Sequence, residues 1–131
     1  MPLFSLYELA DATGVVRTFV APTPAYFWPL LRERTGVEVV VKHENHTPTG
    51  SFKVRGGLVY VEALRRAGGL PKGLVTATRG NHGQSVAVAA VRNGIPAVVV
   101  VPHGNSVEKN AAMRSLGGEL EIGRASCRER V

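Results

Sequence analysis

Cysteine is almost missing from this sequence of 131 residues. The single thiol, Cys127, excludes a framework of intrachain disulfides. Long apolar runs are missing too, since no stretch approaches the roughly 20 residues that cross a bilayer. The N-terminal segment, residues 1–11, contains two acidic residues and no basic one, which is not the pattern of a secretory signal. These absences predict a cytoplasmic protein that does not insert into a membrane.

Positive charge is in excess but is not concentrated anywhere. The net charge is +6, yet the lysines and arginines are scattered, with no run and no interleaved aromatic residues. We therefore expect no nucleic-acid binding. The histidines at 43, 46 and 103 have no cysteine or carboxylate partners at ligand spacing, so we expect no metal site. A nucleophile constellation of the Ser/His/Asp or Cys/His type is also missing.

Alternating strands and helices predict an α/β protein with a parallel sheet. Thr23 and Pro24 resemble the start of a helix that Pro29 limits or restarts and that ends near Gly36. The following elements are expected to be a strand at 37–42, a helix at 51–67, a strand at 74–78, a helix to about 92 with Asn81 as its cap, a strand at 97–101, a helix at 105–116 with Asn105 and Glu108 as a capping box, and the beginning of a strand at 119–122. The continuous apolar run at 97–101 predicts a strand buried on both faces.

The last ten residues, 122–131, differ in composition from those before them. They carry three arginines, one glutamate and the only cysteine, and they resemble the translated read-through of a sequencing adapter. The alternative is a genuine strand end followed by a basic surface turn. We expect an artefactual tail, and a gene that continues beyond residue 121.

Lys53 directly follows an aromatic residue at the predicted start of a helix. An amine is a nucleophile only when it is deprotonated, and burial in an apolar site lowers the pKa of a lysine enough to allow that. Next to Phe52 and after a Pro-Thr-Gly turn, Lys53 is a candidate for Schiff-base chemistry. The alternative is an exposed helix lysine.

A second cluster, residues 78–84, lies at a predicted strand-to-helix turn. Gly80 and Gly83 permit close approach of a ligand to the backbone, and the free N–H groups of a helix start suit a carboxylate or phosphate. The alternative is a tight turn with Asn81 as an ordinary cap. The glycine spacing is not that of a dinucleotide site, and His82 is either structural or an acid/base group.

These motifs together resemble the N-terminal part of the fold-type-II pyridoxal-phosphate enzymes, in particular the serine/threonine dehydratases. The resemblance runs from about residue 9 to 120 and includes Thr23-Pro24, Lys42-His-Glu44, 49–56, 80–84, Val101-Pro102 and Lys109. It implies a three-layer, parallel-sheet α/β fold like that of the tryptophan synthase β-chain, here truncated. Residues 1–72 would be the first part of the larger domain and 73–121 the start of the smaller substrate-loop domain, with 122–131 as the tail.

The resemblance also implies roles for individual residues. Lys53 would hold pyridoxal 5'-phosphate as a Schiff base and remove the α-proton of the substrate, and Phe52 would pack near the cofactor ring. Asn81 would bond to the cofactor's 3′-oxygen, and the loop of Thr78, Arg79, Gly80, Asn81 and His82 would hold the substrate carboxylate. The implied reaction converts a β-hydroxy amino acid into a 2-oxo acid and ammonia, in a protein that is commonly a homo-oligomer.

Two departures from the family pattern leave alternatives open. Arg79 stands where dehydratases commonly have a small residue and racemases a serine, so an acidic substrate such as 3-hydroxyaspartate is an alternative and racemisation is disfavoured. The family's glycine-rich phosphate loop is not in these residues, so we expect weak cofactor binding and no turnover by this chain alone. A serine racemase, a β-replacing synthase and a non-catalytic α/β ligand-binding module are the remaining alternatives.

Overall fold

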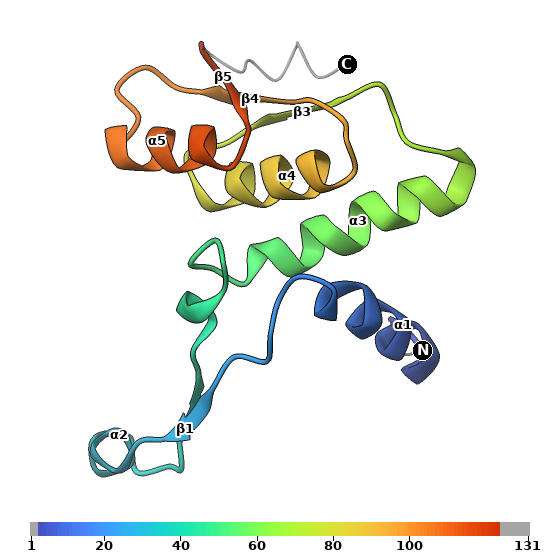
Figure 1. Cartoon of the computed structure of the whole chain (residues 1–131). Helices are drawn as coiled ribbons and strands as arrows, with labels where there is room; N and C mark the ends of the chain where they lie inside the picture. Colours follow the sequence, from blue (N-terminus) through green and yellow to red (C-terminus); the bar gives the residue numbers. More distant parts are fainter. Residues whose placement is uncertain (1–2, 124–131) are drawn as a thin grey trace.

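The computed structural model describes residues 3–123 (Figure 1). Five α-helices, one 3-10 helix and five strands follow one another there. In chain order they are α1 (Leu6–Arg17), β1 (Ala25–Phe27), α2 (Pro29–Thr35), β2 (Val40–Lys42), η1 (Glu44–His46), α3 (Lys53–Gly68), β3 (Leu74–Ala77), α4 (Asn81–Arg92), β4 (Ala97–Val101), α5 (Val107–Ser115) and β5 (Glu119–Ile122). No helix in this part of the chain is long and apolar enough to cross a membrane.

A parallel sheet in the order β3-β4-β5 confirms the predicted sheet in the second half of the chain. The helices α4 and α5 lie on one face of this sheet (Figure 1). The expectation that β4 is buried on both faces is wrong, because burial alternates along it. Ala97, Val99 and Val101 are buried, whereas the two valines between them are half-buried. Those two valines point to the face that α4 and α5 do not cover.

The helices α1, α3 and α4 pack against one another on the side of the sheet that α4 covers (Figure 1). Their shared core consists of Val16 and Val20 from the first segment, Val54 and Leu58 from α3, and Val88 from α4. Each such side chain contributes about 1.5–3 kcal/mol when it is fully buried. This core fixes the beginning of α3 against the middle of α4.

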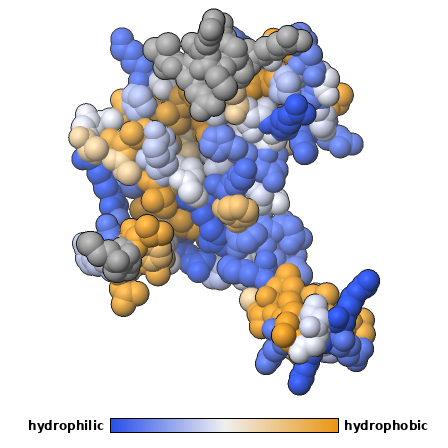
Figure 2. Space-filling view, turned by 180° about the vertical axis from the view of Figure 1, so that it is seen from behind, coloured by the Kyte–Doolittle hydropathy of each residue, from blue (hydrophilic) through white to orange (hydrophobic). Residues whose placement is uncertain are grey.

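An arm formed by β1, α2 and β2 projects from the rest of the molecule (Figure 1). The expected helix from Pro24 to Gly36 is wrong in its first part, because β1 is a strand that pairs antiparallel with β2. Pro29 instead begins α2. The aromatic residues of β1 favour an extended chain, and the residue before a proline is kept out of the helical region. Figure 2 shows the exposed apolar side chains of this arm as a cluster set apart from the body.

The helix starts differ in detail from the sequence-based expectation. The helix α1 was not predicted, although Ser5 and Glu8 form a complete capping box at its start. In α5 the cap is Ser106, which accepts a hydrogen bond from the Lys109 N–H, and not Asn105. In α4 the cap position is Gly80, so Asn81 is the first helical residue.

The described chain ends with β5 and Gly123, which include the first two residues of the expected tail at 122–131. The predicted strand at 119–122 is confirmed as β5, whose Ile122 pairs with Val101. Gly123 donates to the Val101 carbonyl at 2.9 Å. The rest of the expected tail, residues 124–131, lies outside the described residues.

Candidate active site

A buried polar turn places Lys53 at the start of α3. The Ser51 N–H donates to Thr47 Oγ1 at 2.9 Å, and the same hydroxyl donates to the Ser51 carbonyl at 2.8 Å. Gly50 has φ of 66°, in the left-handed region that favours glycine. The chain then enters the helix with Lys53 as its first residue, two positions after the predicted start at 51.

The backbone of Lys53 is bonded to α4. Ser85 Oγ donates to the Lys53 carbonyl at 2.6 Å. The two helices approach closely here, because a Cβ on Gly57 would lie 2.9 Å from the Ser85 carbonyl oxygen. A glycine at 57 is therefore a requirement of the contact that holds Lys53 in place.

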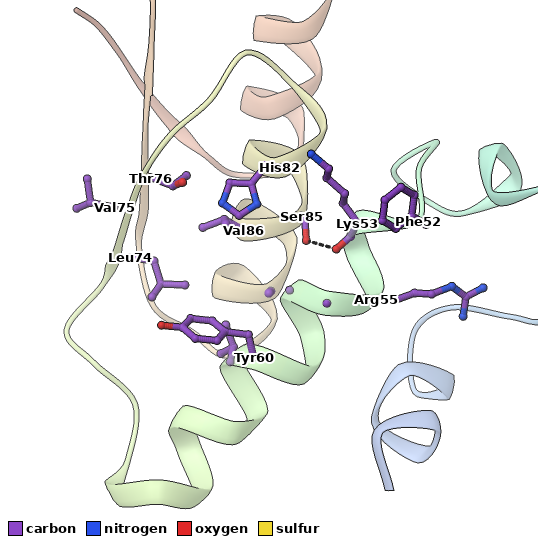
Figure 3. Close-up of a pocket in the computed structure, with 14 residues that line it drawn as sticks. Phe52, Lys53, Arg55, Tyr60, Leu74, Val75, Thr76, His82, Ser85 and Val86 are labelled. Carbon is purple, nitrogen blue, oxygen red and sulfur yellow. Dashed lines mark hydrogen bonds between the residues drawn. The ribbon is translucent and has the colours of Figure 1, made fainter. Parts of the chain in front are cut away.

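The Lys53 side chain runs beside α4 toward its N-terminal end (Figure 3). It is exposed, so the expected burial in an apolar site is wrong for the described residues. The reason is that only α3, α4 and β3 border this side chain here. Its Nζ takes part in no hydrogen bond or ion pair within residues 3–123, which leaves the amine available.

The turn between β3 and α4 presents unused backbone donors. Gly80 N–H donates to Thr78 Oγ1 at 3.2 Å, which fixes the turn. The next three N–H groups, of Asn81, His82 and Gly83, donate to no acceptor among the described residues, as is usual for the first turn of a helix. Such a helix start attracts a carboxylate or phosphate.

Two glycines of this turn have neighbours that exclude a side chain. A Cβ on Gly83 would lie 2.5 Å from Met113 Sδ and 2.8 Å from Val99 Cγ1, so α4 sits directly on β4 and α5. A Cβ on Gly80 would lie 2.9 Å from Lys109 Cδ. The stem of Lys109 therefore lies over the turn and adds a positive residue beside the helix start.

Lys53 and His82, at the starts of α3 and α4, border a hollow of about 620 Å³ between α3, α4 and β3 (Figure 3). Most of its lining is apolar, and its residues are Phe52, Lys53, Arg55, Gly56, Gly57, Tyr60, Val61, Leu74, Val75, Thr76, His82, Ser85, Val86 and Ala89. Phe52, Lys53 and His82 are thus the predicted site residues that the structure brings together. The Phe52 ring is exposed and, in Figure 3, lies on the opposite side of Lys53 from His82.

The remaining predicted residues, Thr78, Arg79, Gly80 and Asn81, do not line the hollow. They form the turn at its edge, where Arg79 and Asn81 are exposed. Sequence reasoning missed Ser85 and Tyr60, although helical spacing could have found them. Ser85 lies three residues after His82, and Tyr60 lies seven after Lys53, so each shares a helix face with a predicted residue.

Half-buried charges surround the other side of α3. Glu44 accepts a hydrogen bond from Arg55 Nε at 2.7 Å, and Figure 3 shows Arg55 pointing away from the hollow. This bond to Arg55, with further help from Thr23, lowers the pKa of Glu44 to about 2, against the opposing effect of burial. The network links α3 to the arm.

The amine of Lys53 and the helix start at His82 border one hollow, and together they are suited to a carbonyl cofactor and an anionic substrate group. The amine can bind an aldehyde covalently, and the helix start can hold a carboxylate. An α/β fold with this arrangement is compatible with enzymes in which a lysine carries a carbonyl cofactor.

Comparison with known proteins identifies the family. The profile described as "Pyridoxal-phosphate dependent enzyme" matches residues 16–130, and the chain belongs to this family. Its matched relatives include L-threonine ammonia-lyases, serine racemases and L-threo-3-hydroxyaspartate ammonia-lyases.

Individual relatives cover most of this chain. The L-threonine ammonia-lyase of Thermotoga maritima is 35% identical over 118 residues, which are 90% of this chain and 29% of that protein. The L-threo-3-hydroxyaspartate ammonia-lyase of a Pseudomonas species is 36% identical over 124 residues, 92% of this chain and 37% of the relative. A crystal structure of a pyridoxal 5'-phosphate-dependent aspartate racemase superposes with a TM-score of 0.87 at 29% identity, covering 99% of this chain and 41% of the other. The chain thus spans less than half the length of each.

These comparisons decide three of the sequence-based predictions. The fold class, that of the fold-type-II enzymes, is confirmed by the solved structures. The cofactor is confirmed because the family depends on pyridoxal phosphate. The enzyme class is confirmed as a lyase by resemblance. The domain boundaries at 72 and 121 and the roles of single residues stay predictions.

Proposed function

We propose that this chain carries the lysine and the carboxylate-binding turn of an ammonia-lyase that converts L-threonine or L-serine into a 2-oxo acid and ammonia. One observation carries the proposal: the amine of Lys53 and the start of α4 border the same hollow. The names of the relatives support the same reaction class.

Each residue has a stated part in this proposal. Lys53 Nζ would hold the cofactor and would accept the α-proton of the substrate. The N–H groups at the start of α4 bind the substrate carboxylate and orient the Cα–H bond toward that amine. Asn81 would hold the 3′-oxygen of the cofactor with its side-chain amide, and Phe52 would border its ring.

The cofactor, when bound, withdraws electrons from the α-carbon, which allows that proton to leave. In the overall reaction a β-hydroxy amino acid would become a 2-oxo acid and ammonia, because the water lost with the β-hydroxyl is balanced by the water that releases ammonia. The protein contributes position and a largely apolar wall, formed in this chain by residues such as Tyr60 and Leu74.

Reductive labelling tests the proposal on the chain itself. The chain has four lysines, at 42, 53, 72 and 109. Incubation with pyridoxal phosphate, reduction by borohydride and peptide mass spectrometry should find the label mainly on Lys53. The Lys53→Arg variant should lose that label and leave the other three sites unchanged. Label spread evenly over the four lysines would instead support a non-catalytic ligand-binding module.

Arg79 favours a second candidate substrate, L-threo-3-hydroxyaspartate. Its guanidinium forms no ion pair among residues 3–123, and it stands at the edge of the proposed carboxylate site. A second substrate carboxylate would pair with it. In a chain of the relatives' length that includes these residues, Arg79→Ala should lower the preference for hydroxyaspartate over threonine by about tenfold, the value of one such pair. An unchanged preference would remove this candidate. Cytoplasmic location and homo-oligomerisation stay predictions.

A further inference from the structure

A charged cluster joins the arm to the start of α3, and its one member that also borders the hollow, Arg55, points its side chain away from it (Figure 3). Glu44 is its centre. It accepts hydrogen bonds from Arg55 Nε at 2.7 Å, from Arg55 Nη2 at 3.0 Å and from Thr23 Oγ1 at 2.6 Å. Lys42 Nζ lies 3.7 Å from Glu44 Oε1 and donates to the Thr23 carbonyl at 3.2 Å. The four residues come from three separate stretches of the chain, around residues 23, 42–44 and 55.

This cluster is stronger than an ordinary surface ion pair. The side chains of Glu44 and Arg55 are only 21% and 26% exposed. The bidentate geometry fixes both groups, and the Thr23 hydroxyl satisfies a further lone pair of the carboxylate. A half-buried pair with such hydrogen bonds resists both water and salt better than an exposed pair.

The start of α3 depends on outside support because it has no cap of its own. Phe52 occupies the cap position and offers no side-chain hydrogen bond. Arg55 follows Lys53 by two residues, so it points roughly 200° around the helix from Lys53. Figure 3 shows the two side chains leaving α3 in different directions. Ser85 therefore holds the Lys53 backbone on the side of α4, and Glu44 holds the same turn from the side of the arm.

We infer that Glu44 and Arg55 are positioning residues, which lock the first turn of α3 so that Lys53 Nζ faces the hollow. Neither residue touches the reacting atoms in this role. The inference rests on the proposed function, since it concerns the lysine that the cofactor would select. Without the pair, the first turn of α3 would keep the Ser85 bond and the packing of Val54, but its uncapped end would lose the one side-chain clamp on the arm side and fray more readily.

Selective labelling of Lys53 is the measurement that tests this role. The chain is incubated with pyridoxal phosphate and reduced, and the label on Lys53 is divided by the label on Lys72. Lys72 is the reference because Lys42 belongs to the cluster. In Glu44→Gln this ratio should fall by about 5- to 10-fold, as expected for loss of hydrogen bonds to a charged group. Arg55→Lys keeps the charge but loses the bidentate geometry, so its ratio should be intermediate.

The same helix offers a matched control. Glu62 forms a similar bidentate pair with Arg65, at 2.8 and 2.7 Å, toward the other end of α3. Glu62→Gln should change the labelling ratio by less than about twofold, because that pair does not contact the first turn. A purely structural effect of losing an ion pair would appear in both variants.

The outcomes separate this inference from the proposed function. If the native chain labels all lysines alike, the proposed function fails. If the native chain labels Lys53 selectively and a folded Glu44→Gln chain does so equally, the positioning role is wrong while the function stands. If Glu44→Gln does not fold, the double variant Glu44→Gln/Arg55→Gln removes both charges and is judged by the same ratio. Hydrogen exchange of the native chain needs no variant: rapid exchange of the Arg55 amide, which bonds to the Phe52 carbonyl, would overturn the inference.

Discussion

Gly83 is the position at which a single methyl group should do most damage to the candidate site. A Cβ there would lie 2.5 Å from Met113 Sδ, 2.7 Å from Thr78 Cγ2 and 2.8 Å from Val99 Cγ1. Met113 and Val99 are fully buried, so the added carbon has no space to enter. Overpacking of this kind costs about 1–3 kcal/mol. The β-branched side chains of Thr78 and Val99 are stiff and can move aside less than the flexible Met113 side chain.

The helix itself opposes part of that cost. Alanine is about 1 kcal/mol better than glycine within a helix, so we expect Gly83→Ala to lower the free energy of unfolding by about 0–2 kcal/mol. Urea unfolding followed by circular dichroism at a fixed temperature measures this difference. The displaced turn should also weaken carboxylate binding at the start of α4.

Gly14→Ala is a matched control, for which we expect the free energy of unfolding to rise. Gly14 lies within α1, and a Cβ there would meet nothing within 4 Å. Gly14→Ala should therefore raise the free energy of unfolding by about 0.5–1 kcal/mol. If Gly83→Ala proves as stable as Gly14→Ala, the close packing of α4 on β4 and α5 is wrong.

Three further predictions follow from hydrogen bonds and charge. Because Arg55 holds the pKa of Glu44 at about 2, below its usual 4.5, this carboxylate stabilises the fold fully above pH 4.5 and loses that effect as pH falls toward 2. Glu44→Gln should remove about 1–2 kcal/mol of that acid-dependent stability, after allowance for solvent screening, and equal acid titrations of the two chains would contradict the assignment. Ser85→Ala should cost about 1 kcal/mol in urea unfolding through loss of its bond to Lys53, and a neutral effect would show that water replaces the hydroxyl. Ser5→Ala should cost α1 about 1 kcal/mol, seen as faster amide exchange at Glu8 but not in α4.

Local signals in the sequence predicted most helices and strands of the second half. The apolar run at 97–101 and the glycines at 117 and 118 mark β4 and the end of α5 without help from distant residues. The first half was harder, because α1 needs only Ser5 and Glu8 to begin and carries a weak apolar pattern. The segment from Pro24 was misassigned because Thr-Pro is found equally at helix starts and in extended chains, and pairing with β2 decided between them.

In the candidate site, too, some features follow from local sequence and others depend on tertiary contacts. The unusual local sequence around Lys53 and Gly80 was enough to select both clusters, since helix starts, glycine turns and a lysine after an aromatic ring are local features. The two clusters meet across one hollow only in the folded chain. The hydrogen bond from Ser85 to the Lys53 carbonyl joins residues 32 positions apart, and the ion pair of Glu44 with Arg55 joins residues 11 positions apart. Such contacts depend on how α3 crosses α4 and how the arm folds back, and no local pattern encodes that geometry. The sequence by itself thus selected the residues that we propose for the chemistry, because their signals are local, whereas only the tertiary structure decided how they face one another and what holds them there.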